Sequence, residues 1–336
     1  MRAFNTLTFK GQTQRLKKLA LAALKKYPFQ ARKLSLLQAD RNAVFRVDTH
    51  DGDKYVIHVA DPVFDLSETR SALWWLSALV NESAVSVPEP IRNIDGDLLT
   101  LQAIEGVPEA RICTVISWVK GLELGMSATL DDVYEWAKVI AQLHQHGAQY
   151  TPPDGFTRMT YNDVLPFPTD ELVIFNDDWQ PLINSTTRRT IFERALEQSN
   201  KAIHRLYQQE ISPQILHGDL HVWNVLRYHT TYSIIDFEDV MWGYPVQDIG
   251  TTLYYARHQP NYHDIRAAFK AGYTTITEWI ETDNGNIDSM IVARFLNLYN
   301  MRLQYANPKH YAVYEQFTAD NETQLRHYIE TGSIRP

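Results

Sequence analysis

The chain has 336 residues, 44% hydrophobic and 21% charged, which is typical of a globular protein of about two domains. The formal net charge of −8 argues against nucleic acid or an anionic membrane as the main partner, because such partners reward clustered lysine and arginine. No secretory signal pattern opens the chain and no run of about 18 uncharged apolar residues occurs, so we expect a cytoplasmic protein without a membrane span.

The single cysteine, Cys113, excludes an intramolecular disulfide and a metal cluster held by several thiolates. It lies within the apolar run 107–119, so we expect it to be a small buried core residue.

The first part of the chain predicts an amphipathic helix followed by a small sheet. Residues 12–26 carry leucine and alanine at helical spacing. Residues 33–37, 44–48 and 54–60 have strand patterns, and the turn signal at 50–53 predicts an antiparallel hairpin between the last two strands.

Three more elements complete this half. Residues 67–80 return to helical spacing, and residues 91–101 contain an Asp-Gly-Asp turn between apolar pairs, which predicts a second hairpin. Residues 111–119 predict the last strand. We therefore place a small, strand-rich N-terminal lobe at residues 1–119.

The second half predicts a mostly helical lobe over residues 120–336. Thr129 and Asp132 form a capping box ahead of a helix that runs to about His146. Residues 151–186 are rich in proline, aspartate and asparagine and predict an irregular insertion. Further helices are expected at 187–209, 264–280, 288–306 and 312–331.

A dense polar stretch between these helices carries groups suited to phosphoryl transfer. Asp219 is followed five residues later by Asn224, and Asp236 ends the next apolar run. Phosphoryl transfer needs a carboxylate to accept or orient the attacking hydroxyl proton, together with oxygen ligands that hold magnesium on the phosphates. These three side chains supply both.

The whole pattern resembles the aminoglycoside phosphotransferase and choline kinase family. It consists of His-Gly-Asp with asparagine five residues after the aspartate, then Ile-Asp-Phe-Glu at 235–238, Gly243 and Asp248. The resemblance covers residues 30–330 and implies an α+β, two-lobed protein-kinase-like fold. It makes residues 1–119 the nucleotide-binding lobe and residues 120–336 the catalytic and substrate lobe. It also implies ATP and Mg²⁺ as cofactors, with Asp219 as catalytic base, Asn224 and Asp236 as magnesium ligands, and His217 and Asp248 as structural residues of the loop.

The nucleotide end departs from that family. His58 occupies the place of the lysine or arginine that pairs with the α- and β-phosphates, and Lys54 on the same strand face is an alternative cation. Histidine is only partly charged at neutral pH. The resemblance assigns Glu68 as the partner of the phosphate-binding cation.

Other nucleotide contacts rest on the resemblance alone. Arg41 and Asn42 in the first turn are candidates for phosphate contacts. Ser117 and Val119, where the last strand ends, would offer main-chain groups to the adenine.

The acceptor is expected to be a small alcohol, with an amine-bearing molecule as a candidate. Only 12 positions separate Asp236 from Asp248, which leaves no room for a protein-kinase activation segment, and Gly218 stands where an arginine would pair with a phosphorylated loop. Carboxylates and aromatic faces suit an ammonium group. The candidate acceptor residues are Trp223, Glu238, Asp239 and Trp242.

Two alternatives stay open. The bacterial stress-response kinases, a branch of the same family, are similar in length and phosphorylate serine and threonine of proteins, so a protein acceptor is the first. The second is a nucleotide-binding pseudokinase, suggested by His58. No nucleophile-elbow, zinc-helix or Walker motif supports a hydrolase, zinc protease or P-loop enzyme. The sequence leaves a monomer and a homodimer equally open.

Overall fold

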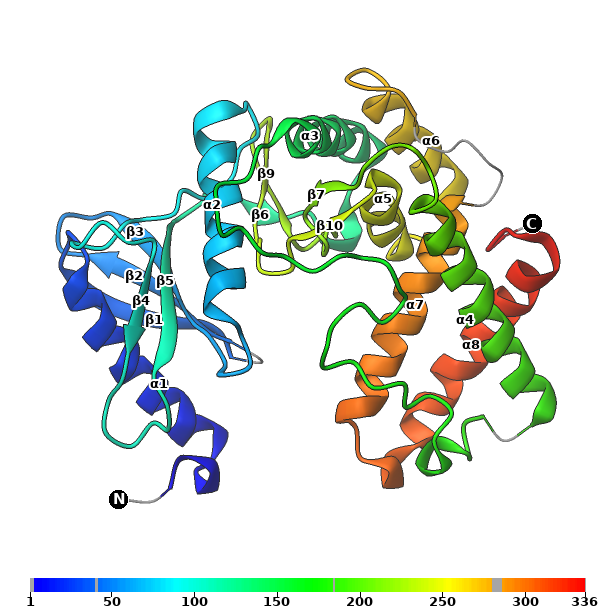
Figure 1. Cartoon of the computed structure of the whole chain (residues 1–336), viewed down its shortest axis with the longest axis horizontal. Coiled ribbons are helices and arrows are strands. Elements are labelled where there is room, and N and C mark those ends of the chain that lie inside the picture. Colours follow the sequence, from blue (N-terminus) through cyan, green and yellow to red (C-terminus); the bar gives the residue numbers. More distant parts are fainter. Residues whose placement is uncertain (1–2, 40–41, 184, 280–285, 336) are drawn as a thin grey trace. The chain divides into compact units, whose positions relative to one another are not determined.

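The structure is a computed structural model that describes residues 3–39, 42–183, 185–279 and 286–335. It confirms the predicted α+β class, with an antiparallel sheet followed by a mainly helical region (Figure 1). The chain forms two compact units. The first consists of Met1–Leu122, Tyr150–Arg158 and Leu226–Glu238, and the second of Glu123–Gln149, Met159–Val225 and Asp239–Pro336.

The first unit is built on a five-stranded sheet of order β1-β2-β3-β5-β4, in which every neighbouring pair is antiparallel. Alternating side chains such as Phe45, Val47 and Ile57 are fully buried, as expected for a sheet with one covered face. The strands are β1 (Ala31–Ala39), β2 (Ala43–Thr49), β3 (Lys54–Val59), β4 (Leu99–Gln102) and β5 (Arg111–Ser117).

Helix α1 (Phe9–Ala23) covers that face. Thr8 caps it by accepting a hydrogen bond from the Gly11 amide, so the helix begins three residues before the predicted start. Leu19 and Ala23 join the sheet residues in one core cluster. Cys113 lies in the same cluster and burial raises the pKa of its thiol to about 12, which confirms its expected place in the core.

Helix α2 (Leu66–Glu82) begins at Asp65, whose carboxylate accepts hydrogen bonds from the amides of Ser67 and Glu68. The predicted hairpin at 91–101 is wrong, because residues 91–98 contain no strand and β4 pairs with β5 instead. The Asn93 side chain binds the amides of residues 95 and 97 in a tight turn, which keeps that stretch out of the ladder.

The loops that contain Asp219, Asn224 and Asp236 connect strands of two small sheets. One contains β6 (Leu122–Glu123), β8 (Val225–Tyr228) and β9 (Thr231–Ile234), and the other pairs β7 (Gln214–Leu216) with β10 (Met241–Gly243). Short 3₁₀ turns lie at Phe4–Thr6, Leu24–Lys26, Gly125–Ser127, Asp177–Trp179 and Pro308–His310.

Helices dominate the second unit, and α3 (Leu130–Gln149) opens it. The predicted capping box is confirmed: the Asp132 carboxylate accepts from the Thr129 amide at 2.9 Å, and the Thr129 hydroxyl accepts from the Asp132 amide at 3.1 Å. Helix α3 packs on α6, and α7 packs on both α4 and α5. The remaining helices are α4 (Thr186–Leu206), α5 (Pro245–Tyr254), α6 (Tyr262–Tyr273), α7 (Asn286–Tyr305) and α8 (Ala312–Thr331).

Helix α6 ends well before residue 280, the predicted end. The hydroxyl of Thr274 bonds back to the Lys270 carbonyl at 2.9 Å, and the hydroxyl of Thr275 bonds back to the Gly272 carbonyl at 2.6 Å. Such side-chain bonds compete with the helical ladder and favour termination. Among the described residues, no helix combines the length and the apolar character that a bilayer crossing needs.

Candidate active site

The loop after β7 in the second unit is held by a buried carboxylate. Asp248, near the start of α5, accepts from the amide of His217 at 3.0 Å and from the amide of Gly218 at 2.9 Å. Asp248 is 1% exposed, and His144 lies 3.4 Å from it. The two amides are therefore fixed by charge-assisted hydrogen bonds, which sets the course of the backbone into Asp219.

Two further bonds hold Asp219 itself. The Asn224 side-chain amide donates to the Asp219 carbonyl at 2.9 Å, and the Asp219 amide donates to Nδ1 of His217 at 3.3 Å. Because the Asn224 nitrogen is engaged, its side-chain oxygen is the atom that remains for a ligand. An amide oxygen is among the ligands that magnesium takes.

The Asp219 carboxylate lies against a positive charge that the sequence analysis did not identify. Oδ1 forms an ion pair with Nη2 of Arg294 on α7, and Oδ2 is 3.4 Å from Nε2 of His221. Burial acts to raise the pKa of Asp219, but the Arg294 charge and then the nearby His221 side chain outweigh it and lower that pKa. Asp219 is thus an ionised group that only accepts hydrogen bonds.

A sequence signal for Arg294 did exist. It is the one charged residue in the run 290–296, whose other members are all buried and apolar. A lone charge inside an apolar helix needs a partner, and that partner is the proposed base.

An aromatic group lies beside the same loop. The ring of Trp223 meets the ring of His221 at 5.6 Å and that of Tyr255 at 5.0 Å, both edge to face. Trp223 is 37% exposed, so part of its indole is open to solvent. Trp242 belongs to the second unit as well, where its main chain binds Met159 and Tyr161.

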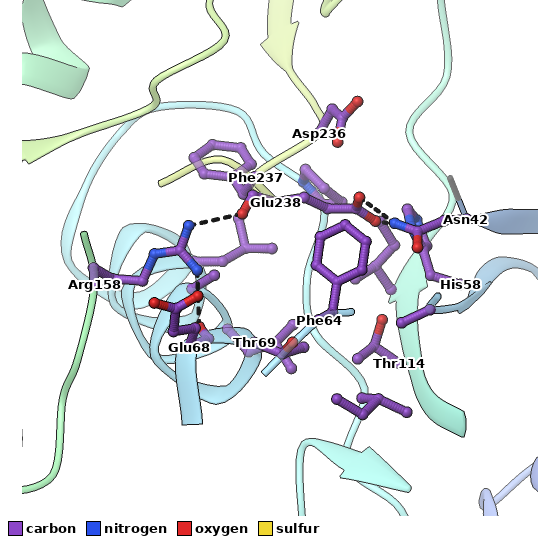
Figure 2. A pocket seen from close by; sticks show the side chains of 17 residues that line it. Asn42, His58, Phe64, Glu68, Thr69, Thr114, Arg158, Asp236, Phe237 and Glu238 are labelled. Carbon is purple, nitrogen blue, oxygen red and sulfur yellow. Dashed lines mark hydrogen bonds and ion pairs between the residues drawn. The ribbon is translucent and has the colours of Figure 1, made fainter. Parts of the chain in front are cut away.

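The first unit contains a pocket between α2, β3, β5 and the segment after β9 (Figure 2). His58, Asn42 and Glu68, three predicted nucleotide contacts, lie in its wall, together with Asp236. Apolar side chains such as Leu76 and Ile116 line the rest. A mainly apolar cleft with a few polar groups is the usual character of a cofactor site.

Asp236 has a backbone conformation that few residues other than glycine adopt. Its φ of 67° lies in the left-handed region. Phe237, the next residue, is buried and packs edge to face on Trp75 with ring centroids 5.6 Å apart. Burial of Phe237 holds the turn, while Asp236 itself stays exposed at the edge of the pocket (Figure 2). Local strain of this kind occurs preferentially at functional sites.

The partner of His58 is Glu238, not Glu68 as expected. Nδ1 of His58 is 2.7 Å from Oε1 of Glu238, and the Asn42 side-chain amide donates to Oε2 of the same carboxylate (Figure 2). Within the first unit, Glu238 therefore lies with the predicted nucleotide contacts, although the sequence assigned it to the acceptor together with Asp239. Arg41 lies outside the described residues.

Arg158 is a second cation that the sequence analysis did not identify. Its Nη1 donates to the Glu68 carbonyl at 3.2 Å and its Nη2 to the Glu238 carbonyl at 2.8 Å, which ties the first turn of α2 to the segment after Asp236. An arginine in an irregular stretch carries no periodic signal, so only the tertiary structure identifies it.

The two predicted adenine contacts differ in their main-chain bonding. The Ser117 amide donates to the Glu89 carbonyl at 2.8 Å, and the Trp118 amide donates to the Lys54 carbonyl at 3.2 Å. In the described ranges, the main chain of Val119 makes no hydrogen bond. Its N–H and C=O are therefore available to a base, whereas the N–H of Ser117 is engaged.

We expect the His58–Glu238 pair to make stability depend on pH. Burial acts to lower the pKa of His58, but the hydrogen bond and charge of Glu238, and then Asp236, outweigh it and raise that pKa above 6.5. A raised folded-state pKa means that the stabilisation is complete below about pH 6.5 and is lost as pH rises through the folded value. The difference in melting temperature between wild type and His58→Gln should therefore be largest near pH 6 and shrink toward higher pH.

The matched control is His50→Gln, which changes an exposed histidine in the turn between β2 and β3. Its melting temperature should follow the wild-type pH profile. Parallel profiles for wild type and His58→Gln would show that His58 carries no pH-dependent pairing.

Comparison with known proteins places the chain in a family. The profile described as "Phosphotransferase enzyme family" (APH) matches residues 34–281. A comparison with curated proteins found no match.

Three solved structures have a similar fold. The microcompartment-associated aminopropanol kinase is 22% identical with a TM-score of 0.78, over 95% of this chain and 99% of that one. The amicoumacin kinase hAmiN, solved with AMP-PNP, Ca²⁺ and Ami, is 16% identical with a TM-score of 0.74, over 97% and 95%. Spectinomycin phosphotransferase APH(9)-Ia, solved with ADP and its antibiotic, is 13% identical with a TM-score of 0.62, over 95% of each chain. The predicted kinase-like fold is thereby confirmed.

Proposed function

Since the chain belongs to the phosphotransferase enzyme family, we propose that it transfers the γ-phosphate of ATP to a hydroxyl of a small molecule. This proposal rests on the position and the charge of Asp219. Its backbone is held through Asn224 and Asp248, and its carboxylate is kept ionised beside Arg294. In this role Asp219 accepts or orients the proton of the attacking hydroxyl, the group that phosphoryl transfer requires of the protein.

The first-unit pocket supports ATP as the donor. Apolar walls from α2 and β5 suit an adenine ring. Val119 follows the end of β5 by two residues, and in the described ranges its main-chain N–H and C=O make no hydrogen bond, so both could serve the adenine edge. Of the two cations on β3, we assign His58 to the phosphates, because it lines the pocket and Lys54 is not among the lining residues. His58 is already paired with Glu238, so its charge reaches the nucleotide only in competition with that carboxylate.

Magnesium fits the oxygen atoms that this chain offers. In the described part of the chain, the side-chain oxygen of Asn224 makes no hydrogen bond, whereas its nitrogen donates to the Asp219 carbonyl. Asp236 contributes an exposed carboxylate. We assign both as magnesium ligands, since hard oxygen donors are what this ion prefers. Bound magnesium would neutralise charge on the phosphates.

We expect Asp236→Ala to weaken Mg·ATP binding, because one hard oxygen ligand is lost. Isothermal titration calorimetry should show at least about a tenfold rise in Kd with magnesium present, since loss of even an outer-shell partner of a metal ligand costs about 10–100-fold in affinity. ATP titrated without magnesium should bind wild type and variant alike.

Asp51→Ala is the matched control, since Asp51 is an exposed aspartate in the turn between β2 and β3 and its loss changes the net charge equally. An unchanged Mg·ATP affinity in Asp236→Ala would remove Asp236 from the metal site.

The acceptor we propose is a small amine-bearing alcohol. Two kinases of similar fold are named for aminopropanol and amicoumacin, and a third structure contains spectinomycin. In this chain the partly exposed ring of Trp223, beside Tyr255, offers an aromatic face for an ammonium group. Asp239 and Trp242 remain acceptor candidates, whereas we reassign Glu238 to the nucleotide pocket.

The test is ADP release from Mg·ATP against a panel of amino alcohols, simple diols, aminoglycosides and a dephosphorylated protein. We expect transfer to at least one amino alcohol, with the phosphate recovered on its hydroxyl. Transfer to serine or threonine of the protein alone would favour the protein-kinase alternative. Tight ATP binding without turnover on any acceptor, water included, would favour the pseudokinase.

A further inference from the structure

Arg294 is a largely buried cation whose only ionic partner among the described residues is the proposed base. It lies in the middle of α7, flanked by Ala293 and Phe295, which are 0% and 2% exposed. Its own side chain is 12% exposed. A guanidinium so placed loses most of its hydration, and helix packing alone gives it no compensation.

The Arg294 side chain makes few hydrogen bonds, and they lead to Asp219 and the neighbouring Tyr255. Nη2 bonds to Oδ1 of Asp219 and lies 3.4 Å from the hydroxyl of Tyr255. Nε is buried without a hydrogen-bond partner in the described part of the chain. An arginine that served stability alone would be expected to have a hydrogen-bond partner for each of its buried N–H groups. The Nε–H without a partner therefore needs another explanation.

Asp219 has no alternative anchor of equal strength. Besides Arg294, the one side chain that contacts its carboxylate in the described ranges is His221, and that distance is 3.4 Å, longer than an ordinary hydrogen bond. Asn224 and His217 bind the main chain of Asp219, not its carboxylate. The loop thus fixes where the residue lies, and Arg294 fixes which way its oxygens face.

We propose that Arg294 is a positioning residue for the phosphoryl-transfer reaction. By binding Oδ1, it holds the Asp219 side chain in one rotamer, with Oδ2 turned to receive the acceptor hydroxyl. This inference rests on the proposed role of Asp219. Without Arg294, the Asp219 carboxylate would be wrongly oriented toward the acceptor hydroxyl. A misplacement of about 1 Å at a reacting group lowers rates on the order of 10²-fold.

The test is a double-mutant cycle on the full chain with Mg·ATP and water as the acceptor, so that it needs no identified substrate. We expect Arg294→Gln to lower the rate of ADP release on the order of 10²-fold with an unchanged Kd for Mg·ATP. Arg294→Lys, which keeps the charge, should recover part of the loss. In an Asp219→Asn background, Arg294→Gln should cause no further loss.

Arg302→Ala is the control, because Arg302 is an exposed arginine on the same helix, over the ring of Phe317. Its rate should equal that of wild type. An Arg294→Gln rate within about twofold of wild type, or an equal loss in both backgrounds, would overturn the positioning role. If Asp219→Asn itself releases ADP at the wild-type rate, the proposed function fails, and with it the role of Arg294.

Thermal unfolding of the same four proteins gives a readout that does not need turnover. The two single replacements each leave a charge without its partner, so the double variant should melt higher than the sum of the two single shifts predicts. Additive shifts would show that the two side chains do not interact in solution and would overturn the inference.

Discussion

Asp219→Asn should lower kcat by roughly 10²–10⁴-fold, the range typical for loss of a general base. The isosteric amide keeps the size of the side chain but removes the charge that binds the acceptor proton. Mg·ATP should bind as before, because none of the nucleotide contacts assigned here involves this carboxylate. The measurement is single-turnover phosphate transfer at saturating nucleotide, which separates chemistry from product release.

The structure adds a stability effect to this prediction. Arg294 loses its partner in Asp219→Asn, and an unpaired buried charge is destabilising, so the melting temperature should fall. Asp131→Asn, at the exposed first turn of α3, provides the control for a lost surface carboxylate. It should leave the rate unchanged and lower the melting temperature only by the small effect of one helix-dipole contact. A kcat within about tenfold of wild type in Asp219→Asn would remove Asp219 from the role of base.

Gly218→Ala should be the most destabilising replacement in the loop. Gly218 has a φ of 83°, and a Cβ built there would lie 2.1 Å from the Asp239 carbonyl oxygen. The backbone must therefore move, and the amides bound by Asp248 move with it. Strain and overpacking together predict a loss of about 2–5 kcal/mol, measurable by chemical denaturation, along with near-complete loss of phosphoryl transfer.

Gly155→Ala is the control that separates the effect of the steric clash from the effect of the left-handed backbone conformation. Gly155 has nearly the same φ, 82°, but a Cβ there meets nothing within 4 Å. Gly155→Ala should cost about 1 kcal/mol, the strain of a left-handed residue alone, with activity unchanged. Equal effects of the two replacements would show that the approach of the Asp239 carbonyl does not constrain the loop.

Much of the fold could be predicted from local sequence patterns. The strands at 44–48 and 54–60 and the capping box at Thr129 lie where periodicity and capping chemistry put them. These features depend on neighbours a few residues apart, which is why the sequence shows them directly. The hairpin at 91–101 failed because the side chain of Asn93, a local competitor for main-chain donors, outweighed the alternation of apolar pairs.

By itself, the sequence determined which chemistry is present, because the spacing of Asp219, Asn224 and Asp236 is itself the motif. Only the tertiary structure decided which charges act on it. Arg294 lies 75 positions from Asp219, and Glu238 lies 180 positions from the histidine it binds. Ion pairs of this kind arise from folding, since a charge interacts strongly only over a few ångströms, whatever the separation along the chain.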